Sequence, residues 1–153
     1  FIGAPHGIKT TTRSDMDFAI DAGKPSPLIA NSEAEFEVML DFLFHRRPWL
    51  PYPVAWVARD DALRNASSNV RLWNEQLSDR YLLDAQIDAL RTPTLVLWGE
   101  QDRVFDVSGA EVLRQRLRGA EVHVMPQVGH LPMLEAARAS ASMYAKFLAR
   151  PRV

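Results

Sequence analysis

The fold is decided by the stretch Thr94-Leu95-Val96-Leu97-Trp98-Gly99-Glu100-Gln101-Asp102. Its apolar run lies between Pro93 and Gly99, and such a run predicts a strand that is buried on both faces of a parallel sheet. An acid, Asp102, follows just after the glycine. Because α/β proteins carry their chemistry on loops at the carboxyl ends of parallel strands, we expect Asp102 at a functional edge of the sheet.

A second strand and loop follow further along the chain. The segment Glu121–Met125 has the pattern of a strand, and Val128-Gly129-His130-Leu131-Pro132 comes after it. A strand–loop–helix–strand unit fits the gap between Asp102 and His130 and would place two parallel strands side by side. We therefore expect a carboxylate oxygen of Asp102 within about 2.6–3.2 Å of Nδ1 of His130. Asp106 is the rival acid, but it lies further from the strand end.

Together, Leu95–Asp102 and Gly129-His130 resemble the C-terminal part of an α/β-hydrolase. In that family the triad runs in the order nucleophile, acid, histidine, so the resemblance implies that Asp102 is the catalytic acid and His130 the catalytic base. It also implies the fold class: an α/β protein comprising the C-terminal part of an α/β-hydrolase parallel sheet, with an inserted helical cap. Val104, Phe105 and Leu131 flank the pair and are candidates for an apolar substrate wall.

The nucleophile of this family is absent from the chain. It should lie in a G-x-S-x-G turn, but no serine here has paired glycines around it, and there is no cysteine. The chain also begins at Phe1 rather than Met, with a residue pattern typical of mid-strand. We expect an upstream fragment of the same enzyme to carry the nucleophile and the oxyanion hole, and we expect the chain alone to be inactive.

Three regions are expected along the chain. Residues 1–12 would be the end of a core strand and a loop, because two glycines and a proline disfavour a helix there. Residues 13–88 would form the helical cap, and residues 89–153 the C-terminal part of the hydrolase core. His6 would then lie near the rim of the site, although a loop histidine without a function is the simpler interpretation.

Short signals predict where the helices begin. They are the capping boxes Ser32 with Glu35 and Ser108 with Glu111, a cap at Ser67 or Ser68, and prolines in the first turn at Pro53 and Pro132. A turn of helix is also expected at residues 14–22. The helix that follows Ser32 has a narrow polar stripe, so we expect it to be covered on two sides.

The composition excludes several classes of function. A net charge of −1 gives no argument for binding to nucleic acid or to an anionic membrane, and we expect neither nucleic acid as a partner nor a transmembrane segment, since no apolar run is long enough. The lack of cysteine excludes disulfides and thiolate metal sites, and the four histidines have no metal-ligand spacing, so no cofactor or metal is expected. The compartment stays open: cytoplasmic, periplasmic or secreted.

The resemblance implies a lipase-like or esterase-like enzyme that cleaves a small, lipophilic carboxylic ester through an acyl-enzyme. Hydrolysis of a carbon–carbon bond, an epoxide or a haloalkane is the alternative within the fold, and the last two need an Asp nucleophile upstream. A non-catalytic, hydrolase-like domain that binds a ligand or a partner is the alternative from another class, because a fold does not determine its function.

Overall fold

The computed structural model describes residues 1–150 of the chain. Within this range the sheet has three parallel strands in the order β1 (Ile2–Gly3), β2 (Leu95–Gly99) and β3 (Glu121–Met125). Every residue of the central strand β2 is buried. The two predicted strands and their parallel pairing are therefore confirmed, with Gly99 opposite Met125 at the carboxyl ends.

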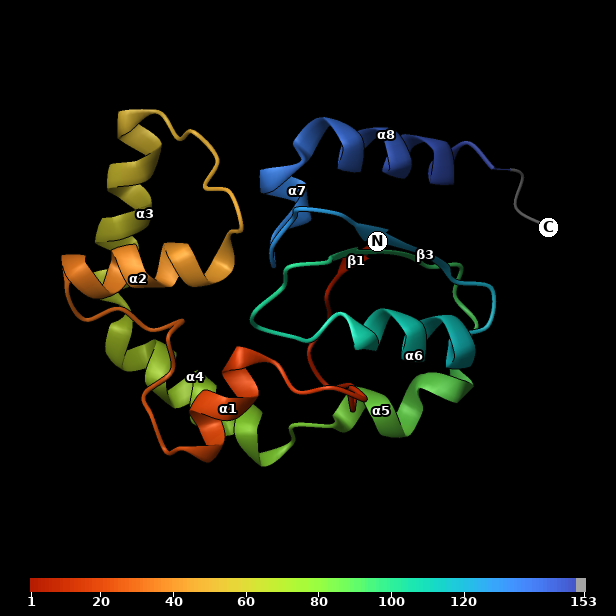
Figure 1. Ribbon diagram of the computed structural model, residues 1–153, viewed down its shortest axis with the longest axis horizontal. Helices are drawn as coiled ribbons and strands as arrows, with labels where there is room; N and C mark the ends of the chain where they lie inside the picture. The colour runs from red at the N-terminus through yellow and green to blue at the C-terminus, as the bar shows by residue number, and fades with distance from the viewer. Residues whose placement is uncertain (151–153) are drawn as a thin grey trace.

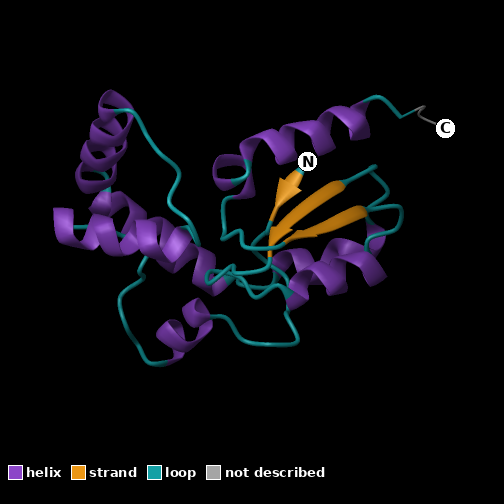
Figure 2. Ribbon diagram, turned by 45° about the horizontal axis from the view of Figure 1, so that its top comes forward, coloured by secondary structure: helices purple, strands orange, loops and turns teal. Residues whose placement is uncertain are grey.

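Helices cover both faces of this sheet (Figures 1 and 2). One face packs on α6 (Ser108–Arg116), α5 (Leu82–Gln86) and the 3₁₀ turn η1 (Ile87–Ala89). The other packs on α7 (Pro132–Glu135) and α8 (Ala137–Leu148). Side chains alternate along a strand, so Val96 and Trp98 join the first cluster while Leu95 and Leu97 join the second.

A helical segment lies between β1 and β2 in the chain and beside the carboxyl end of the sheet in space (Figure 2). Its helices are α1 (Asp15–Asp21), α2 (Glu33–Leu43), α3 (Tyr52–Arg64) and α4 (Ala66–Ser78). Met16 of α1 and Phe42 of α2 pack on Val104, which follows β2. This small cluster joins the helical segment to the sheet.

The helical segment corrects two expectations. Helix α2 is covered on one side, with Phe36 and Phe42 buried while Val38 is 59% exposed. Only half of the capping box at Ser32 forms: its hydroxyl accepts from the N–H of Glu35, but the Glu35 carboxylate accepts from Asn31 instead. The Asn31 backbone and side-chain donors both reach that carboxylate, and these hydrogen bonds lower the pKa of Glu35.

Neither predicted serine cap exists on α4 or α6. Helix α4 begins at Ala66 because Asn65 ends α3 and its carbonyl already accepts from the N–H of Asn69. The Ser108 hydroxyl accepts from the backbone N–H groups of Thr11 and Thr12, far away in sequence, so it does not cap α6.

The last helix is also shorter than expected. Pro132 does open a helix, but the chain breaks at Ala136 into α7 and α8. Within residues 1–150, no helix has both the length and the apolarity needed to span a bilayer.

Candidate active site

Asp102 lies in the tight turn that follows β2. Its N–H donates to the carbonyl of Gly99 (3.3 Å), and its Oδ1 accepts from the N–H groups of Val104 (2.8 Å) and Phe105 (3.0 Å). The carboxyl group is fully buried, with 0% of the side chain exposed. A short acid that bonds to backbone groups two and three residues on is typical of such turns, and here it fixes the carboxylate and leaves Oδ2 free.

His130 lies in the loop that follows β3, and its ring meets that free oxygen. Nδ1 lies 2.9 Å from Oδ2 of Asp102, within the distance and with the ring nitrogen that the sequence predicts. The histidine side chain is 15% exposed. With Nδ1–H donating to the carboxylate, the neutral ring presents Nε2 as a proton acceptor.

The two loops meet because their strands are parallel neighbours. The N–H of Glu100 donates to the carbonyl of Met125 (2.9 Å), and that of Gln101 donates to the carbonyl of Val128 (3.0 Å). A Cβ at Gly99 would overlap the carbonyl oxygens of Val128 and Gly129. Glycine is therefore required at the end of β2 for the two loops to approach this closely.

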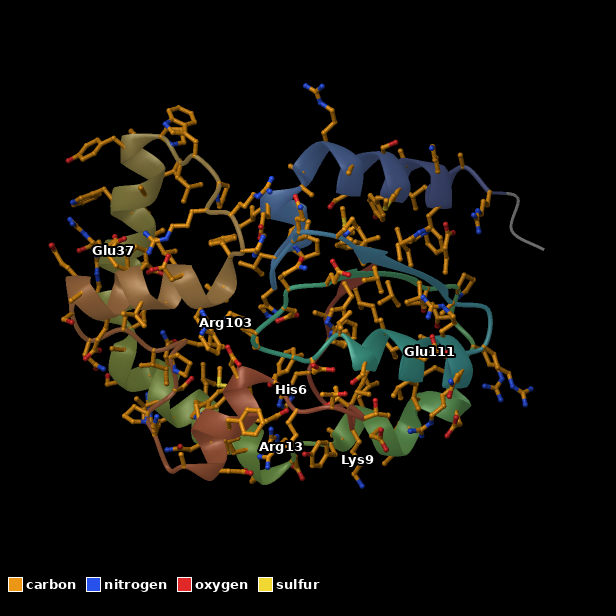
Figure 3. All side chains as sticks on the ribbon, in the orientation of Figure 1. His6, Lys9, Arg13, Glu37, Arg103 and Glu111 are labelled. Atoms are coloured by element: carbon orange, nitrogen blue, oxygen red, sulfur yellow. The ribbon has the colours of Figure 1, made fainter. Side chains whose placement is uncertain are left out.

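Aromatic rings extend from His130 toward the first loop. Phe105 stands edge-on to the His130 ring at 5.3 Å between centroids, and the ring of His6 lies 5.5 Å from Phe105. Figure 3 shows His6 between α1 and α6, where the helical segment meets the core. Burial, together with the positive charge of Arg80, lowers the pKa of His6 and favours its neutral form.

The other sequence candidates have different positions. Asp106, the rival acid, accepts from the N–H of Ser108 (2.9 Å) at the start of α6 and does not contact His130. Phe105 and Leu131 are partly exposed next to the pair. Val104 is 0% exposed, and its side chain packs in the cluster with Met16 and Phe42.

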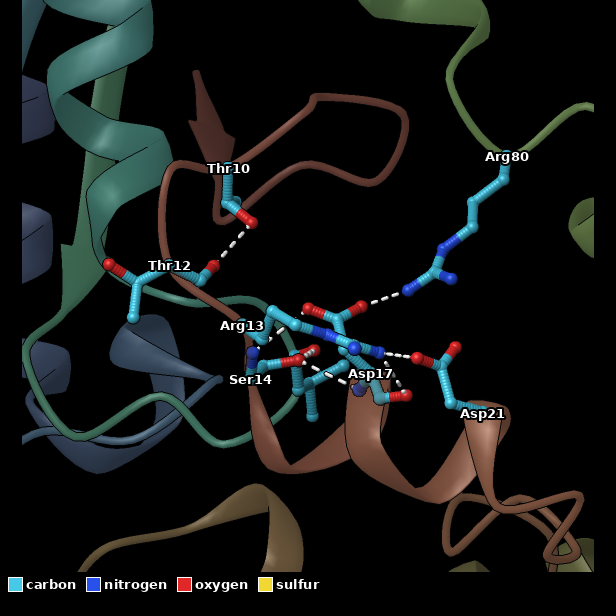
Figure 4. A network of polar contacts seen from close by, with 8 residues as sticks. Thr10, Thr12, Arg13, Ser14, Asp17, Asp21 and Arg80 are labelled. Atoms are coloured by element: carbon cyan, nitrogen blue, oxygen red, sulfur yellow. Dashed lines mark hydrogen bonds and ion pairs between the residues drawn. The ribbon is translucent and has the colours of Figure 1, made fainter.

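The turn is also connected to α1 through polar contacts. The buried hydroxyl of Ser14 donates to the carbonyl of Val104 (2.8 Å) and accepts from the N–H of Asp17. The Asp17 carboxylate accepts a hydrogen bond from the N–H of Ser14 and forms an ion pair with Arg80. Figure 4 shows this network, with Arg13 and Asp21 paired beside it. Helix α1 is thereby fixed against the loop that carries Asp102.

Several cavities adjoin the site or the helical segment. One of about 430 Å³ lies beside the Asp102 turn, between Arg103 and the end of α2 at Phe44. A larger one of about 750 Å³ lies among α1, α2 and α4, with Ile20, Val38 and Trp73 in its lining. Within residues 1–150, no group of three or more His, Cys, Asp or Glu side chains is placed to hold a metal ion.

The family follows from comparison with known proteins. A model of the alpha/beta hydrolase fold matches residues 31–137, which is more than half of the chain. The chain belongs to the α/β-hydrolase superfamily. The predicted fold class, a parallel sheet flanked by helices, is confirmed.

Curated relatives of this α/β-hydrolase are lipases by name. It is 32% identical over 123 residues to Lipase 3 of Moraxella sp. (strain TA144), covering 80% of this chain and 39% of the relative. It is 32% identical over 125 residues to monoacylglycerol lipase ABHD6 of Rattus norvegicus, covering 80% and 37%. The chain thus spans about two fifths of the length of these relatives.

Solved structures give the same fold. A membrane phospholipase A, described as a bacterial virulence factor, superposes with a TM-score of 0.87 at 30% identity, covering 95% of this chain and 47% of that one. A meta-cleavage product hydrolase from Pseudomonas fluorescens IP01 superposes with a TM-score of 0.65 at 18% identity, covering 94% and 52%. At such low identity the second likeness shows the fold alone.

Sequence reasoning missed Glu135. Its carboxylate accepts hydrogen bonds from three backbone N–H groups, one in the His130 loop and two just after α2. An acid in the first turn of a helix is common because it suits the helix dipole, so nothing in the local pattern marked this one. Two of its three partners lie about ninety residues away in the chain.

Proposed function

We propose that this chain supplies the acid and the base of a serine-hydrolase triad, with Asp102 as the acid and His130 as the base. The observation that carries the proposal is the 2.9 Å contact between Nδ1 of His130 and a carboxylate that is fully buried. A buried carboxylate on Nδ1 holds the imidazole in the tautomer whose Nε2 can accept a proton.

The reaction that such a pair serves is ester hydrolysis through an acyl-enzyme. Nε2 of His130 takes the proton of a serine hydroxyl as the serine oxygen attacks the ester carbonyl. The ester C–O bond then breaks, and His130 gives the proton to the leaving alcohol. A water molecule next attacks the acyl-enzyme, passes its proton through His130 to the serine oxygen, and releases the acid. Asp102 stays ionised and stabilises the imidazolium that forms.

The nucleophile in this proposal comes from an upstream part of the same enzyme. No serine in residues 1–153 has the glycine surroundings of a nucleophile turn. The same proposal keeps the three expected regions: a strand end and loop in residues 1–12, a cap in residues 13–88, and the core in residues 89–153. The position of α1 to α4 beside the carboxyl end of the sheet supports a cap.

We propose small, lipophilic esters as the substrate class. Lipase 3 and monoacylglycerol lipase ABHD6 are named for acting on lipids. The cavity among α1, α2 and α4 also fits an apolar group, since Trp73, Ile20 and Val38 line it. Phe105 and Leu131 remain the proposed wall beside His130. The carbon–carbon, epoxide and haloalkane alternatives have no contact in the described residues that favours them.

The decisive experiment measures ester hydrolysis by the complete enzyme. His130→Ala should reduce kcat by about 10⁴-fold or more, because the serine loses its base. Asp102→Asn should be nearly as severe, because the amide favours the wrong tautomer. Asp106→Asn is the matched control, since that carboxylate only bonds to the start of α6, and kcat should fall less than about tenfold. A crippling Asp106→Asn with a harmless Asp102→Asn would refute the assignment.

A second experiment tests where the nucleophile lies. The pure 153-residue chain should not hydrolyse p-nitrophenyl esters above background, because it has a base and no activated hydroxyl. Turnover that a serine-directed phosphonate blocks would show that a serine of this chain is the nucleophile.

A further inference from the structure

The carboxylate of Glu135 binds two segments that are far apart in the chain. Its Oε2 accepts from the N–H of Gly129 (2.9 Å), the residue before His130, and from the N–H of His45 (3.2 Å). Its Oε1 accepts from the N–H of Arg46 (2.6 Å). His45 and Arg46 follow the end of α2, so one side chain holds the His130 loop and the end of a helix in the helical segment.

These bonds satisfy backbone N–H groups that have no partner in a helix or a strand. Gly129, His45 and Arg46 lie outside helices and strands, where backbone N–H groups have no ladder to join. Hydrogen bonds to an ionised acceptor are roughly twice as strong as neutral ones. A single carboxylate with three such donors is therefore a strong restraint on both loops.

Two neighbouring hydrogen bonds complete the same junction. The N–H of His130 donates to the carbonyl of Leu43 (2.8 Å), and the guanidinium of Arg46 donates to the side chain of Gln127 (2.7 Å). A Cβ at Gly129 would lie 2.6 Å from the nitrogen of His45. The two loops are thus packed backbone against backbone, and the side chain of Glu135 is what spans them.

We propose that Glu135 is a positioning residue for His130. Its carboxylate fixes the backbone from Gly129 to His130 against the end of α2, and so keeps the imidazole on Asp102. The proposal rests on the proposed function only in taking His130 as the base. A misplacement of about 1 Å in a catalytic group costs roughly 10²-fold in rate, so a restraint on this loop matters for catalysis as well as for folding.

The loop before His130 contains a strained residue, which makes a restraint on this loop necessary. Gln127, three residues before His130, has a φ of 57°, in the left-handed region that non-glycine residues seldom occupy. Such a conformation persists only where the surroundings determine it. Arg46 donates to the side chain of Gln127 itself, and the Glu135 carboxylate accepts from the N–H of Gly129, two residues later. Without the carboxylate we expect the loop to relax and the contact between His130 and Asp102 to open more often.

The first test uses this chain and needs no nucleophile. NMR spectra would follow hydrogen exchange at the N–H of Gly129 and at Nδ1–H of His130 in the parent, Glu135→Ala and Glu135→Gln. In Glu135→Ala we expect exchange at both sites to rise at least about tenfold, because opening of the loop becomes easier. Glu135→Gln keeps the size of the side chain and one acceptor oxygen, so its exchange rates should lie between those of the parent and of Glu135→Ala. If Glu135→Ala does not fold, the comparison of Glu135→Gln with the parent tests the proposal.

Glu111→Gln is the matched control, because Glu111 also lies in the first turn of a helix but contacts only the side chains of Arg114 and Gln115. It should leave exchange at Gly129 and His130 within about twofold of the parent. Exchange in the Glu135 variants that also stays within about twofold would overturn the proposal.

The second test uses the complete enzyme. Glu135→Ala should lower kcat by roughly 10–100-fold with KM within about threefold, and Glu135→Gln should recover part of the loss. Partial unfolding would also lower the apparent kcat at constant KM, so each kcat is calculated per mole of folded enzyme, with the folded fraction measured by circular dichroism. Equal losses in Glu111→Gln and Glu135→Ala would refute a positioning role. Should the parent itself lack activity, the proposed function would fail while the exchange experiment still decided the role of Glu135.

Discussion

The sheet and the helical segment treat similar apolar sequences differently. In β2 the four apolar side chains from Leu95 to Trp98 are fully buried. Helix α3 and the elbow before it are also rich in apolar residues, yet α3 has no buried residue, and Trp49 and Tyr52 are 85% and 79% exposed. An apolar pattern therefore predicts whether a segment forms a helix or a strand. Burial of its side chains depends on which other segments of the chain pack against it.

The difference in burial between the sheet and the helical segment suggests different roles for the two regions. Asp102 and His130 both follow strands of the sheet. Asp102 bonds to the carbonyl of Gly99 and to backbone N–H groups of its own turn. The N–H of His130 donates instead to the carbonyl of Leu43 at the end of α2. The large apolar-lined cavity lies instead among α1, α2 and α4, where side chains are more exposed. Regions with few buried contacts open at lower free energy, so we expect the pair to be rigid and the helical segment to adapt. Four comparisons of variants test this expectation.

The largest effect is expected from a pair of glycine substitutions. Gly99→Ala should abolish the folded state, because its Cβ would overlap two backbone carbonyls that cannot move without separating the loops. Gly23→Ala, in the helical segment, meets no atom within 4 Å and strains only a φ of 63°, so it should cost about 1 kcal/mol. Urea unfolding followed by circular dichroism measures both. A folded Gly99→Ala variant would show that the junction of the loops is softer than we describe.

Truncation of an apolar side chain should separate the two regions next. Leu97→Ala removes a side chain with 0% exposure and should reduce the free energy of unfolding by about 2–5 kcal/mol. Val57→Ala in α3 removes one that is 56% exposed and should change it by less than about 0.5 kcal/mol. The same unfolding measurement applies. A comparable loss in both variants would mean that α3 is covered in solution.

The helix caps offer a finer comparison within the helical segment. Ser14 caps α1 and also donates to Val104 in the buried turn, whereas Ser32 caps α2 at an exposed position. Ser14→Ala should cost about 2 kcal/mol, since a buried carbonyl also loses its donor, and Ser32→Ala about 1 kcal/mol. Equal costs would show that the network of α1 adds nothing to the turn that carries Asp102.

The smallest effect concerns His6, at the boundary of the two regions. Its pKa in the folded chain lies below the ordinary value of 6.5, so the unfolded chain binds the proton more readily. Stability should therefore fall as the pH drops through 6.5, and level off below the folded pKa. Unfolding midpoints at several pH values should show this slope in the parent. The slope should diminish in His6→Asn, and an unchanged slope would assign it to other groups.

What could be predicted from sequence is what depends on local pattern and chain order. The strands β2 and β3 follow from short apolar runs bounded by proline or glycine, and their parallel pairing follows from the helix between them. The contact of Nδ1 with Asp102 then follows from geometry at the carboxyl ends of neighbouring strands. Helix α2 was also predictable from the cap at Ser32 and its apolar spacing, and α3 from the first-turn Pro53. The expected turn of helix at residues 14–22 contains α1.

What failed depends on residues far away in the chain. Ser108 was predicted to cap its own helix, but its hydroxyl accepts hydrogen bonds from the backbone N–H groups of Thr11 and Thr12 instead. The packing of Val104 on Met16 and Phe42 was also not visible in the sequence. Glu135 gave no local signal, because its partners come from a loop that only the fold brings near. Hydrogen-bonding capacity is visible in a sequence, whereas the choice of partner is not.

The bonds of Glu135 to His45 and Arg46 bear on how hybrid enzymes should be built from this fold. A graft that takes the whole of residues 13–88 from a relative would place a foreign backbone on that carboxylate and beside the loop of His130. A hybrid could keep the native residues Leu43–Arg46 and exchange the helices before and after them. This would alter the cavity among α1, α2 and α4 while leaving the hydrogen bonds to Glu135 intact. The splice points for new selectivity would therefore lie inside the helical segment, on either side of a four-residue stretch that hydrogen-bonds to His130 and Glu135.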